Sequence, residues 1–325
     1  MAAAKEAAHC GAKVVLFDYV KPSPKGSKWG LGGTCVNVGC VPKKLFHYAS
    51  LLGAGMHDAA ALGWDMKGAA PRHDWETMVE GVQNHIGMLN FTYRKGLKSA
   101  KVTYVNALAT LTGPNTVAYE LKGEQRAATG DKIIIAVGGR PFVPYDAIPG
   151  ARELAITSDD LFSLESAPNK TLVVGGGYIA LECAGFLTEL GYDVTVAVRS
   201  KTLLRGFDRQ CAEKIGGMMA DLGTKFAYEW SPKSIEKVGA GRLRVILAGP
   251  DGAEKSDLFD TVLFGTGRGA DTAALGCPAA GIKCVTAEGK FDVGADERTD
   301  VPHIFAIGDV VSGRQELTPV AVRAG

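Results

Sequence analysis

Residues 170–200 read KTLVVGGGYIALECAGFLTELGYDVTVAVRS, and this stretch decides the fold class. The β-branched run at residues 171–174 predicts a strand, and the apolar periodicity that follows predicts a helix ending near Leu190. Residues 193–198 predict a second strand. A strand, a helix and a second strand in this order form a βαβ unit with two parallel strands. The unit therefore predicts an α/β protein.

The turn between the first strand and the helix is typical of dinucleotide binding. Gly175, Gly177 and Ala180 have the spacing G-x-G-x-x-A, with Tyr178 and Ile179 at the start of the helix. The turn is tight, and the pyrophosphate of a cofactor must lie against backbone N–H groups at the positive end of the helix. We therefore predict nucleotide binding at these five residues, the alternative being a turn that serves packing alone.

The end of the second strand indicates which nucleotide is bound. Units that bind NAD offer Asp or Glu to the ribose hydroxyls at this point, whereas this chain has Arg199, Ser200 and, shortly after, Arg205. An acid would repel a 2′-phosphate, and the guanidinium groups attract it. We therefore predict NADPH in preference to NADH, the alternative being that these arginines belong to a solvated loop.

A second set of nucleotide-binding fragments is divided between the two ends of the chain. A helix at residues 2–9 is followed by a strand at residues 13–18, which ends in Asp18, where an acid would bond a ribose. Two more strands, at residues 133–137 and 303–307, run directly into glycine. The neighbouring candidate residues are Gly32, Gly33, Thr34, Gly138, Gly139, Arg140, Gly308 and Asp309. A glycine pair alone is only a turn, but together the fragments predict a discontinuous domain that contains the middle unit as an insertion.

The sequence GGTCVNVGCVPKK at residues 32–44 contains a candidate redox pair, Cys35 and Cys40. On a regular helix, residues five apart have Cα atoms about 8.7 Å apart, which is too far for a disulfide. The segment must therefore be distorted, and Gly39 permits this. Pro42 suits the first turn of a helix, which places Cys40 near a helix N-terminus, where the thiolate is favoured. The alternatives are two independent core cysteines or, with still less support, a zinc site, for which no second ligand pair is present.

Composition excludes several other classes of protein. The 325 residues include 36 basic and 35 acidic side chains and 46% hydrophobic residues, so neither a disordered chain nor a polycation that coats nucleic acid is expected. No apolar run reaches the roughly 18 to 20 residues that span a membrane. The seven cysteines are odd in number and scattered, which is typical of buried thiols in the cytosol. We expect a cytoplasmic protein, with a mitochondrial location left open.

With these motifs, the chain resembles the pyridine nucleotide-disulfide oxidoreductases, in particular the large, animal-type thioredoxin reductases and thioredoxin-glutathione reductases. The segments that carry the resemblance are KWGLGGTCVNVGCVPKK at residues 28–44, KTLVVGGGYIALECAGFL at 170–187, VRSKTLLRGFD at 198–208 and FAIGDVVSGRQELTPVAVRAG at 305–325. The resemblance runs from end to end of the chain.

The resemblance implies two Rossmann-like nucleotide-binding domains, each with three layers in the order ββα. An NADPH-binding domain at residues 160–290 is inserted into an FAD-binding domain at residues 1–159 and 291–325. The helix at residues 2–9 has no opening strand, so the first strand and the G-x-G-x-x-G motif of the FAD domain are expected to precede Met1. The dimer-interface domain is expected after Gly325, so these residues are interpreted as a fragment of a homodimeric protein.

The resemblance also implies roles for individual residues. Cys40 is the thiol beside the flavin and Cys35 is the interchange thiol that passes electrons onward. Lys43 and Glu182 form an ion pair near the reactive nitrogen of the flavin, and Tyr178 is a gate over the nicotinamide pocket. The further implied contacts are Gly267 and Arg268 with NADPH, and Asp18, Thr34, Asp309, Glu316, Leu317 and Thr318 with FAD.

The implied reaction passes electrons from NADPH to FAD, then to the Cys35–Cys40 disulfide, and then to thioredoxin or a similar small disulfide protein. Glutathione reductase and thioredoxin-glutathione reductase remain rival interpretations, and so does a dihydrolipoamide dehydrogenase, although its NAD is disfavoured by Arg199 and Arg205. A non-catalytic nucleotide-binding fragment is the alternative from another class. No metal, nucleic acid or membrane partner is predicted. We expect the fragment to hold FAD weakly and to reduce no thioredoxin.

Overall fold

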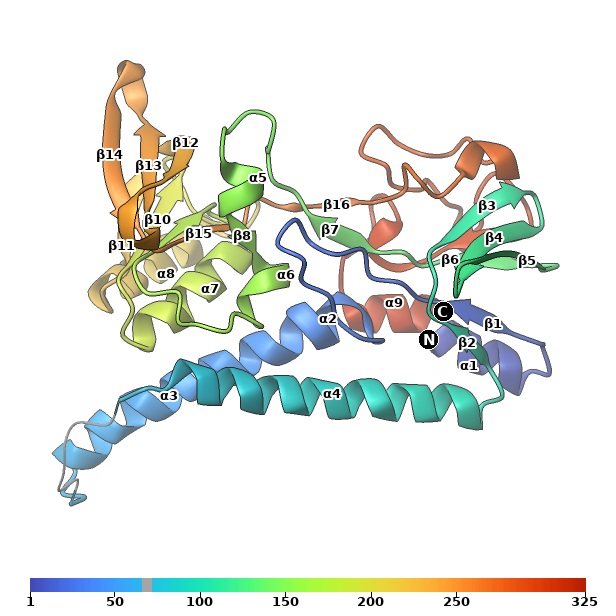
Figure 1. Cartoon of the computed structure of the whole chain (residues 1–325), viewed down its shortest axis with the longest axis horizontal. Coiled ribbons are helices and arrows are strands. Elements are labelled where there is room, and N and C mark those ends of the chain that lie inside the picture. Colours follow the sequence, from blue (N-terminus) through green and yellow to red (C-terminus); the bar gives the residue numbers. More distant parts are fainter. Residues whose placement is uncertain (66–71) are drawn as a thin grey trace.

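The computed structural model describes residues 1–65 and 72–325 and has an α/β fold (Figure 1). Its main sheet has five parallel strands in the order β11-β10-β9-β15-β8. These strands are β8 (Ile156–Thr157), β9 (Thr171–Val174), β10 (Val194–Val198), β11 (Lys225–Tyr228) and β15 (Thr261–Phe264). The predicted βαβ unit is confirmed, because helix α7 (Tyr178–Glu189) connects the paired strands β9 and β10.

This sheet is the middle layer of three. On one face, Val173 and Val196 pack in a core with Leu187 and Phe186 of α7, and α8 (Arg209–Asp221) lies on the same side. On the other face, Leu172 and Ala197 pack against an antiparallel meander in a second core. The meander consists of β12 (Ser231–Lys237), β13 (Leu243–Ala248) and β14 (Glu254–Phe259), with one-turn helices η1 (Gly239–Gly241) and η2 (Pro250–Gly252) between the strands. The predicted ββα layering is therefore present around this sheet.

The two ends of the chain meet in a second region of short strands (Figure 1). β1 (Val15–Phe17) pairs in parallel with β2 (Thr103–Val105), and β6 (Ile133–Ile135) pairs in parallel with β17 (Ile304–Ala306). The predicted strands at residues 13–18, 133–137 and 303–307 are thus confirmed with shorter bounds. An antiparallel meander lies beside them, formed by β3 (Ala109–Gly113), β4 (Thr116–Leu121) and β5 (Glu124–Thr129).

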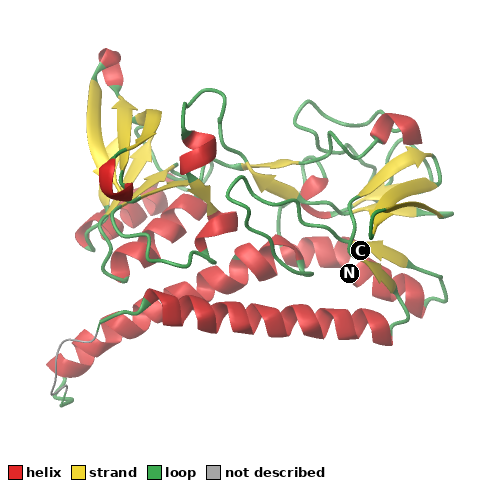
Figure 2. Cartoon of the chain, in the orientation of Figure 1, coloured by secondary structure: helices red, strands yellow, loops and turns green. Residues whose placement is uncertain are grey.

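Helices run beneath both regions (Figure 2). The two long ones are α3 (Cys40–Ala61) and α4 (Trp75–Ser99), and they pack against each other. Helix α4 begins at a capped end, because the Asp74 side chain accepts a hydrogen bond from the Thr77 N–H. The other helices are α1 (Ala2–His9), α2 (Gly33–Val38), α5 (Ala151–Leu154), α6 (Ser158–Leu161), α9 (Thr318–Ala324) and the one-turn helices η3 (Cys277–Ala280) and η4 (Gly308–Val310).

The chain passes between the two regions at an antiparallel pair, β7 (Gly139–Pro141) with β16 (Arg268–Ala270). Strand β8 lies before residue 160 but hydrogen-bonds within the main sheet. The segment after β16 packs in the other region, since Leu275 accepts a hydrogen bond from the Leu111 N–H at 2.8 Å. The domain limits at residues 159 and 290 stay a prediction, and this packing favours limits near β7 and β16 instead.

The prediction that the thiols are buried is correct only in part. Cys183 and Cys277 are buried, but Cys10 and Cys211 are exposed. Cys10 is the residue at which α1 ends, and Cys211 lies in the first turn of α8, so both occupy helix ends that solvent reaches. A scattered cysteine count therefore does not distinguish a core thiol from a surface thiol.

Phe46 is the buried side chain that joins the long helices to the main sheet, and its loss tests this packing. It is 0% exposed, and the rings of Trp75, Phe162 and Phe186 lie 5.2 to 5.4 Å from its centroid. We expect Phe46→Ala to lower the free energy of unfolding by roughly 3–5 kcal/mol in urea denaturation. Tyr48→Ala, which removes an exposed ring from the same helix, is the control and should cost about 0.5 kcal/mol or less. Equal losses from the two variants contradict this account of the core.

Candidate disulfide and dinucleotide site

The structure joins Cys35 and Cys40 in a disulfide, with their Cα atoms 4.6 Å apart. The predicted distortion is present, because α2 ends at Val38 and α3 begins at Cys40, with Gly39 between them. A Cβ atom on Gly39 would lie only 3.0 Å from the Thr34 carbonyl oxygen and 3.1 Å from the Cys35 Cα. Glycine is therefore required where the backbone folds back to bring the sulfurs together.

Cys40 is the first residue of α3, as the sequence predicts. No side chain caps this end of the helix, so the N–H groups of its first turn are available to stabilise a negative charge on sulfur. Cys40 is exposed and Cys35 is half-buried. Exposure alone does not show which cysteine is the flavin-side thiol and which is the interchange thiol. These two roles stay predictions that depend on the resemblance and on the position of Cys40.

Lys43 and Glu182 form the predicted ion pair, with Lys43 Nζ 2.8 Å from Glu182 Oε1. Lys43 lies one turn after Cys40, and Glu182 lies in the first turns of α7, so the pair joins the disulfide helix to the dinucleotide helix. The two helices also pack against each other. The ammonium group of Lys43 is therefore held toward α7.

The glycine turn before α7 is tight, as the sequence predicts, and it packs closely against the backbone after β15. Gly175 has φ +133°, and a Cβ atom there would lie 2.4 Å from the carbonyl oxygen of Gly265. Helix α7 begins after Gly177, where no side chain makes a capping hydrogen bond. The N–H groups of Tyr178 and Ile179 therefore lie in an uncapped first turn, which is the arrangement that binds phosphate.

The arginines after β10 present positive charge that no carboxylate neutralises. Arg199 and Arg205 are exposed, and within residues 1–65 and 72–325 neither makes an ion pair. Ser200 lies between them, and its hydroxyl donates to the Thr202 carbonyl at 2.8 Å. The guanidinium groups of Arg199 and Arg205 can therefore bind an anion without first breaking a salt bridge, although Lys201 between them is ion-paired to Glu229.

Arg268 and Arg140 lie at the crossing between β7 and β16. The Arg268 guanidinium donates to the Gly139 carbonyl at 2.6 Å and to Thr34 Oγ1 at 3.2 Å. Arg140 donates to the Lys21 carbonyl at 2.9 Å and stacks on the Trp29 ring. Both guanidinium groups therefore hold protein segments together, whatever nucleotide contact they also make.

Asp159 is a buried residue that the sequence reasoning missed. Its carboxylate is 2.9 Å from Arg140 and 3.8 Å from Arg268, and its side chain is 1% exposed. Burial raises its pKa, and the two guanidinium groups act against that rise. The only local signal was the sequence TSDD at residues 157–160, which predicts a capped helix start and no ion pair.

The predicted FAD residues fall in two places. Asp309, Glu316 and Arg268 surround a small recess with Gly139 and Lys290, and an ion pair joins Lys290 to Glu316. Burial raises the pKa of Asp309, and the charge of Glu316 raises it further. Gly308, Leu317 and Thr318 adjoin this group at η4 and the start of α9, which has no side-chain cap.

Asp18 lies apart from this recess, directly after β1. Burial raises its pKa, and the charge of the Met1 amine lowers it. Gly32 precedes the uncapped N-terminus of α2, which contains Gly33 and Thr34. Gly33 and Gly138 have φ of +75° and +66°, and Gly267 has φ of +125°, so each adopts a backbone conformation that favours glycine.

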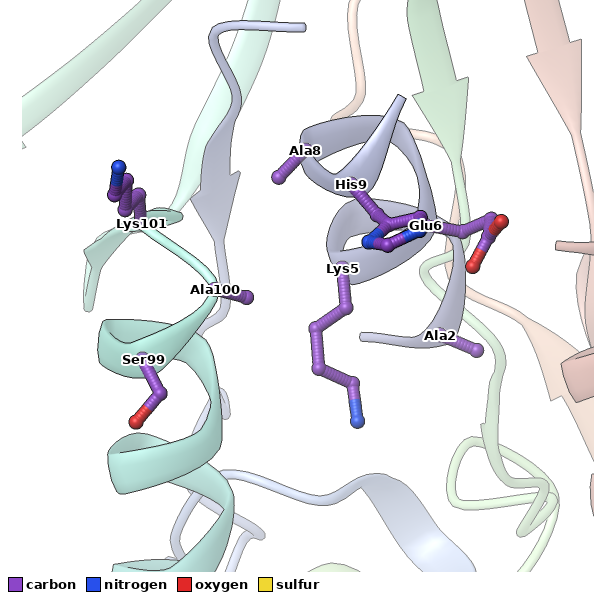
Figure 3. Close-up of a pocket in the computed structure, with 8 residues that line it drawn as sticks. All are labelled: Ala2, Lys5, Glu6, Ala8, His9, Ser99, Ala100 and Lys101. Atoms are coloured by element: carbon purple, nitrogen blue, oxygen red, sulfur yellow. The ribbon is translucent and has the colours of Figure 1, made fainter. Parts of the chain in front are cut away.

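A cavity of about 680 Å³ lies between α1 and the end of α4 (Figure 3). Its lining includes Ala2, Lys5, His9, Ser99 and Lys101. None of the predicted site residues lines this cavity.

Among the described residues, no group of three or more His, Cys, Asp or Glu side chains is arranged to hold a metal ion. Within the same part of the chain, none of the helices combines the length and apolar character that crossing a membrane requires.

A disulfide at the start of one helix and a glycine turn at the start of a neighbouring helix are the two features of the site, and comparison with known proteins places the chain in a family. A family model described as pyridine nucleotide-disulphide oxidoreductase matches residues 1–325, and the chain belongs to this family. The resemblance inferred from the sequence is confirmed, and the predicted FAD and NADPH are cofactors of the family.

Three curated relatives match the whole chain. Thioredoxin reductase 2, mitochondrial, of Drosophila melanogaster is 51% identical over 328 residues, and the chain covers 63% of it. Thioredoxin reductase SEP1 of Emiliania huxleyi and a thioredoxin reductase of Plasmodium falciparum are each 50% identical, with 66% and 59% of their lengths covered. The chain thus spans less than two thirds of the length of each of these relatives.

The thiol of Cys183, next to Glu182, gives a pH-dependent prediction. Complete burial raises its pKa to about 12. An unfolded chain ionises this thiol near pH 8.5 to 9, so each pH unit above about 9 favours unfolding by roughly 1.4 kcal/mol until the folded thiol also ionises. We expect the free energy of unfolding to fall more steeply between pH 9 and 10.5 in the wild type than in Cys183→Ala. If the free energy of unfolding, measured in urea, falls equally with pH in the wild type and in Cys183→Ala, the prediction is wrong.

Proposed function

We propose that the protein is an NADPH-dependent flavoprotein disulfide reductase, specifically a thioredoxin-disulfide reductase, in which Cys35 and Cys40 are the redox centre. One observation carries the proposal. The helix that begins at Cys40 is ion-paired, one turn later, to the helix that begins at the glycine turn, with Lys43 Nζ 2.8 Å from Glu182 Oε1. A disulfide and a dinucleotide turn are thereby held on two helices in direct contact.

The residues around the glycine turn fit NADPH. The uncapped N-terminus of α7 would hold the pyrophosphate, and Gly175 allows the tight turn before it to pack against the Gly265 carbonyl. Arg199 and Arg205, neither of which has a carboxylate partner in the described chain, would hold the 2′-phosphate. Tyr178, 55% exposed at the first position of α7, would cover the nicotinamide at this turn.

The residues at the second region fit FAD. Asp18 follows a parallel strand, where a carboxylate bonds ribose hydroxyls, and Asp309 follows another. The uncapped starts of α2, at Gly33 and Thr34, and of α9, at Thr318, offer free N–H groups. When bound, NADPH would supply a hydride, and FAD would accept it and pass two electrons on to the disulfide.

The protein's own chemistry is thiol–disulfide exchange. In the reduced site, the Cys35 thiolate attacks one sulfur of the substrate disulfide, which forms a mixed disulfide and releases one substrate thiolate. The Cys40 thiolate, stabilised at the start of α3, then attacks the Cys35 sulfur. This step re-forms the Cys35–Cys40 bond and releases the second substrate thiolate, so two electrons have moved to the substrate.

Thioredoxin is the substrate we propose, because the similar relatives carry the name thioredoxin reductase at about 50% identity. Glutathione reductase and thioredoxin-glutathione reductase are the alternatives for the same chemistry, and a non-catalytic nucleotide-binding fragment is the alternative from another class. We further propose that the intact protein is a cytoplasmic homodimer, with no nucleic-acid or membrane partner, although one relative is mitochondrial.

Turnover with a small aromatic disulfide tests the proposed redox centre without requiring thioredoxin docking. With FAD supplied, the chain is expected to oxidise NADPH as it reduces 5,5′-dithiobis(2-nitrobenzoate), and Cys35→Ser and Cys40→Ser are expected to abolish this, because each removes one sulfur of the pair. Cys211→Ser, which alters an exposed thiol elsewhere, is the matched control and should keep the rate. Undiminished turnover in both serine variants of the pair contradicts the proposal, and no turnover in the wild type favours the non-catalytic fragment.

Nucleotide discrimination tests the proposed NADPH site separately. Arg199→Ala and Arg205→Ala should each weaken NADPH binding about 10- to 100-fold in calorimetric titration, since each removes a charged hydrogen bond worth roughly 1.5–3 kcal/mol. The binding of NADH, which has no 2′-phosphate, should change little. Arg244→Ala, on strand β13 and close to Glu236, is the control. If the variants weaken the binding of NADPH and of NADH equally, the arginines do not recognise the 2′-phosphate and this part of the proposal is wrong.

A further inference from the structure

Two buried asparagines connect the disulfide loop to helix α4. Asn37 lies inside the loop, between Cys35 and Cys40, and is 2% exposed. Asn90 lies on α4 and is 7% exposed. The Asn90 side-chain N–H donates to Asn37 Oδ1 at 2.9 Å, so an amide pair in the interior joins segments far apart in the sequence.

Each amide also donates a hydrogen bond to a backbone carbonyl in the segment that leads into Cys35. Asn37 Nδ2 donates to the Gly33 carbonyl at 2.8 Å, within α2, and Asn90 Nδ2 donates to the Leu31 carbonyl at 2.6 Å. The fit is close, since a Cβ atom on Gly30 would lie 2.3 Å from Asn90 Oδ1. The segment that leads into the disulfide is therefore held by a chain of hydrogen bonds.

If the contact between α4 and the disulfide segment served packing alone, it would need no polar side chains. Burying an amide is unfavourable unless its hydrogen bonds are made, and apolar side chains fill such a space as well. The neighbouring α4 positions that face inward are apolar, namely Ile86 and Leu97. The amide pair differs from them because it holds the backbone that leads into Cys35 and the side chain of Asn37, which lies between the two cysteines.

We propose that Asn37 and Asn90 are positioning residues that set the equilibrium between the Cys35–Cys40 disulfide and its dithiol. When the disulfide opens, the hydrogen bonds of Asn37 and Asn90, here called the clamp, keep the segment around the two cysteines folded. The two thiols then stay at high effective concentration, and the bond re-forms readily. Without the clamp, the opened loop gains conformational freedom, and this favours the dithiol. The inference rests on the proposed function of the pair as a redox centre.

The test measures this equilibrium directly on the 325-residue chain, in buffers of graded reduced and oxidised dithiothreitol. Each protein disulfide that opens takes two electrons and two protons from one dithiothreitol, which closes to its cyclic disulfide. Alkylation followed by trypsin yields residues 29–43, WGLGGTCVNVGCVPK, which contain only the two cysteines of interest. The fraction alkylated in this peptide gives the equilibrium constant without flavin or NADPH.

We expect Asn90→Ala and Asn37→Ala each to raise the equilibrium constant for opening about three- to tenfold, the equivalent of roughly one lost hydrogen bond. The double variant should shift it by less than the product of the single shifts, because the two side chains share one hydrogen bond. Asn90→Ser serves the same comparison if the alanine variant does not fold by circular dichroism.

Gln83→Ala is the matched control. Gln83 is a half-buried amide on the same helix, and it donates to the Phe162 carbonyl at 2.7 Å, away from the loop. Its loss lowers stability but should leave the disulfide equilibrium within about twofold of the wild type. Folded asparagine variants with the wild-type equilibrium, or an equal shift in Gln83→Ala, overturn the inference. Because no cofactor is present, neither result depends on whether NADPH reduces the pair.

Discussion

The contact between helices α3 and α7 is the constraint on which the rest of the arrangement depends. At one end of it, Lys43 and Glu182 are ion-paired at 2.8 Å, and farther along the buried ring of Phe46 packs on Phe186. The ion pair is partly exposed, so its net contribution to stability is small, and the aromatic packing supplies most of the attraction. The polar pair sets the register of two helices that the apolar contact holds together. That register places Cys40 and the glycine turn on adjoining elements.

The helix that carries Cys40 and the helix that follows the glycine turn both begin without a capping side chain, and this is the main electrostatic feature of the arrangement. These two helices, α3 and α7, begin at Gly39 and Gly177. Unsatisfied N–H groups at such ends favour negative charge, whether a thiolate or a phosphate. By contrast, α4 and α8, which serve structural purposes, are capped by Asp74 and Asp208. The free ends therefore lie where anions are expected in the proposed reaction.

The parts of the fold that the sequence predicted are those fixed by local chemistry. The glycine turn at Gly175, the strands on either side of α7, and the distortion at Gly39 follow from sterics within a few residues. Asp159 and Asn90 could not be found in this way. Asp159 pairs with Arg140 and Arg268, which lie 19 and 109 residues away, and Asn90 pairs with Asn37, which lies 53 residues away. These contacts form only when separate elements pack together. The pairing of β7 with β16 could not be predicted from the sequence either, because it joins short segments with no periodicity of their own.

The central proposal is that electrons from NADPH pass through FAD to the Cys35–Cys40 bond, which the contact between α3 and α7 holds on an element adjoining the glycine turn. The most direct measurement adds one equivalent of NADPH, without oxygen, to the chain loaded with FAD, and then counts alkylated cysteines in the peptide of residues 29–43. The account predicts two newly alkylated thiols per NADPH consumed, with none gained when the nucleotide is omitted. NADPH oxidation that leaves this peptide disulfide-bonded would contradict the account.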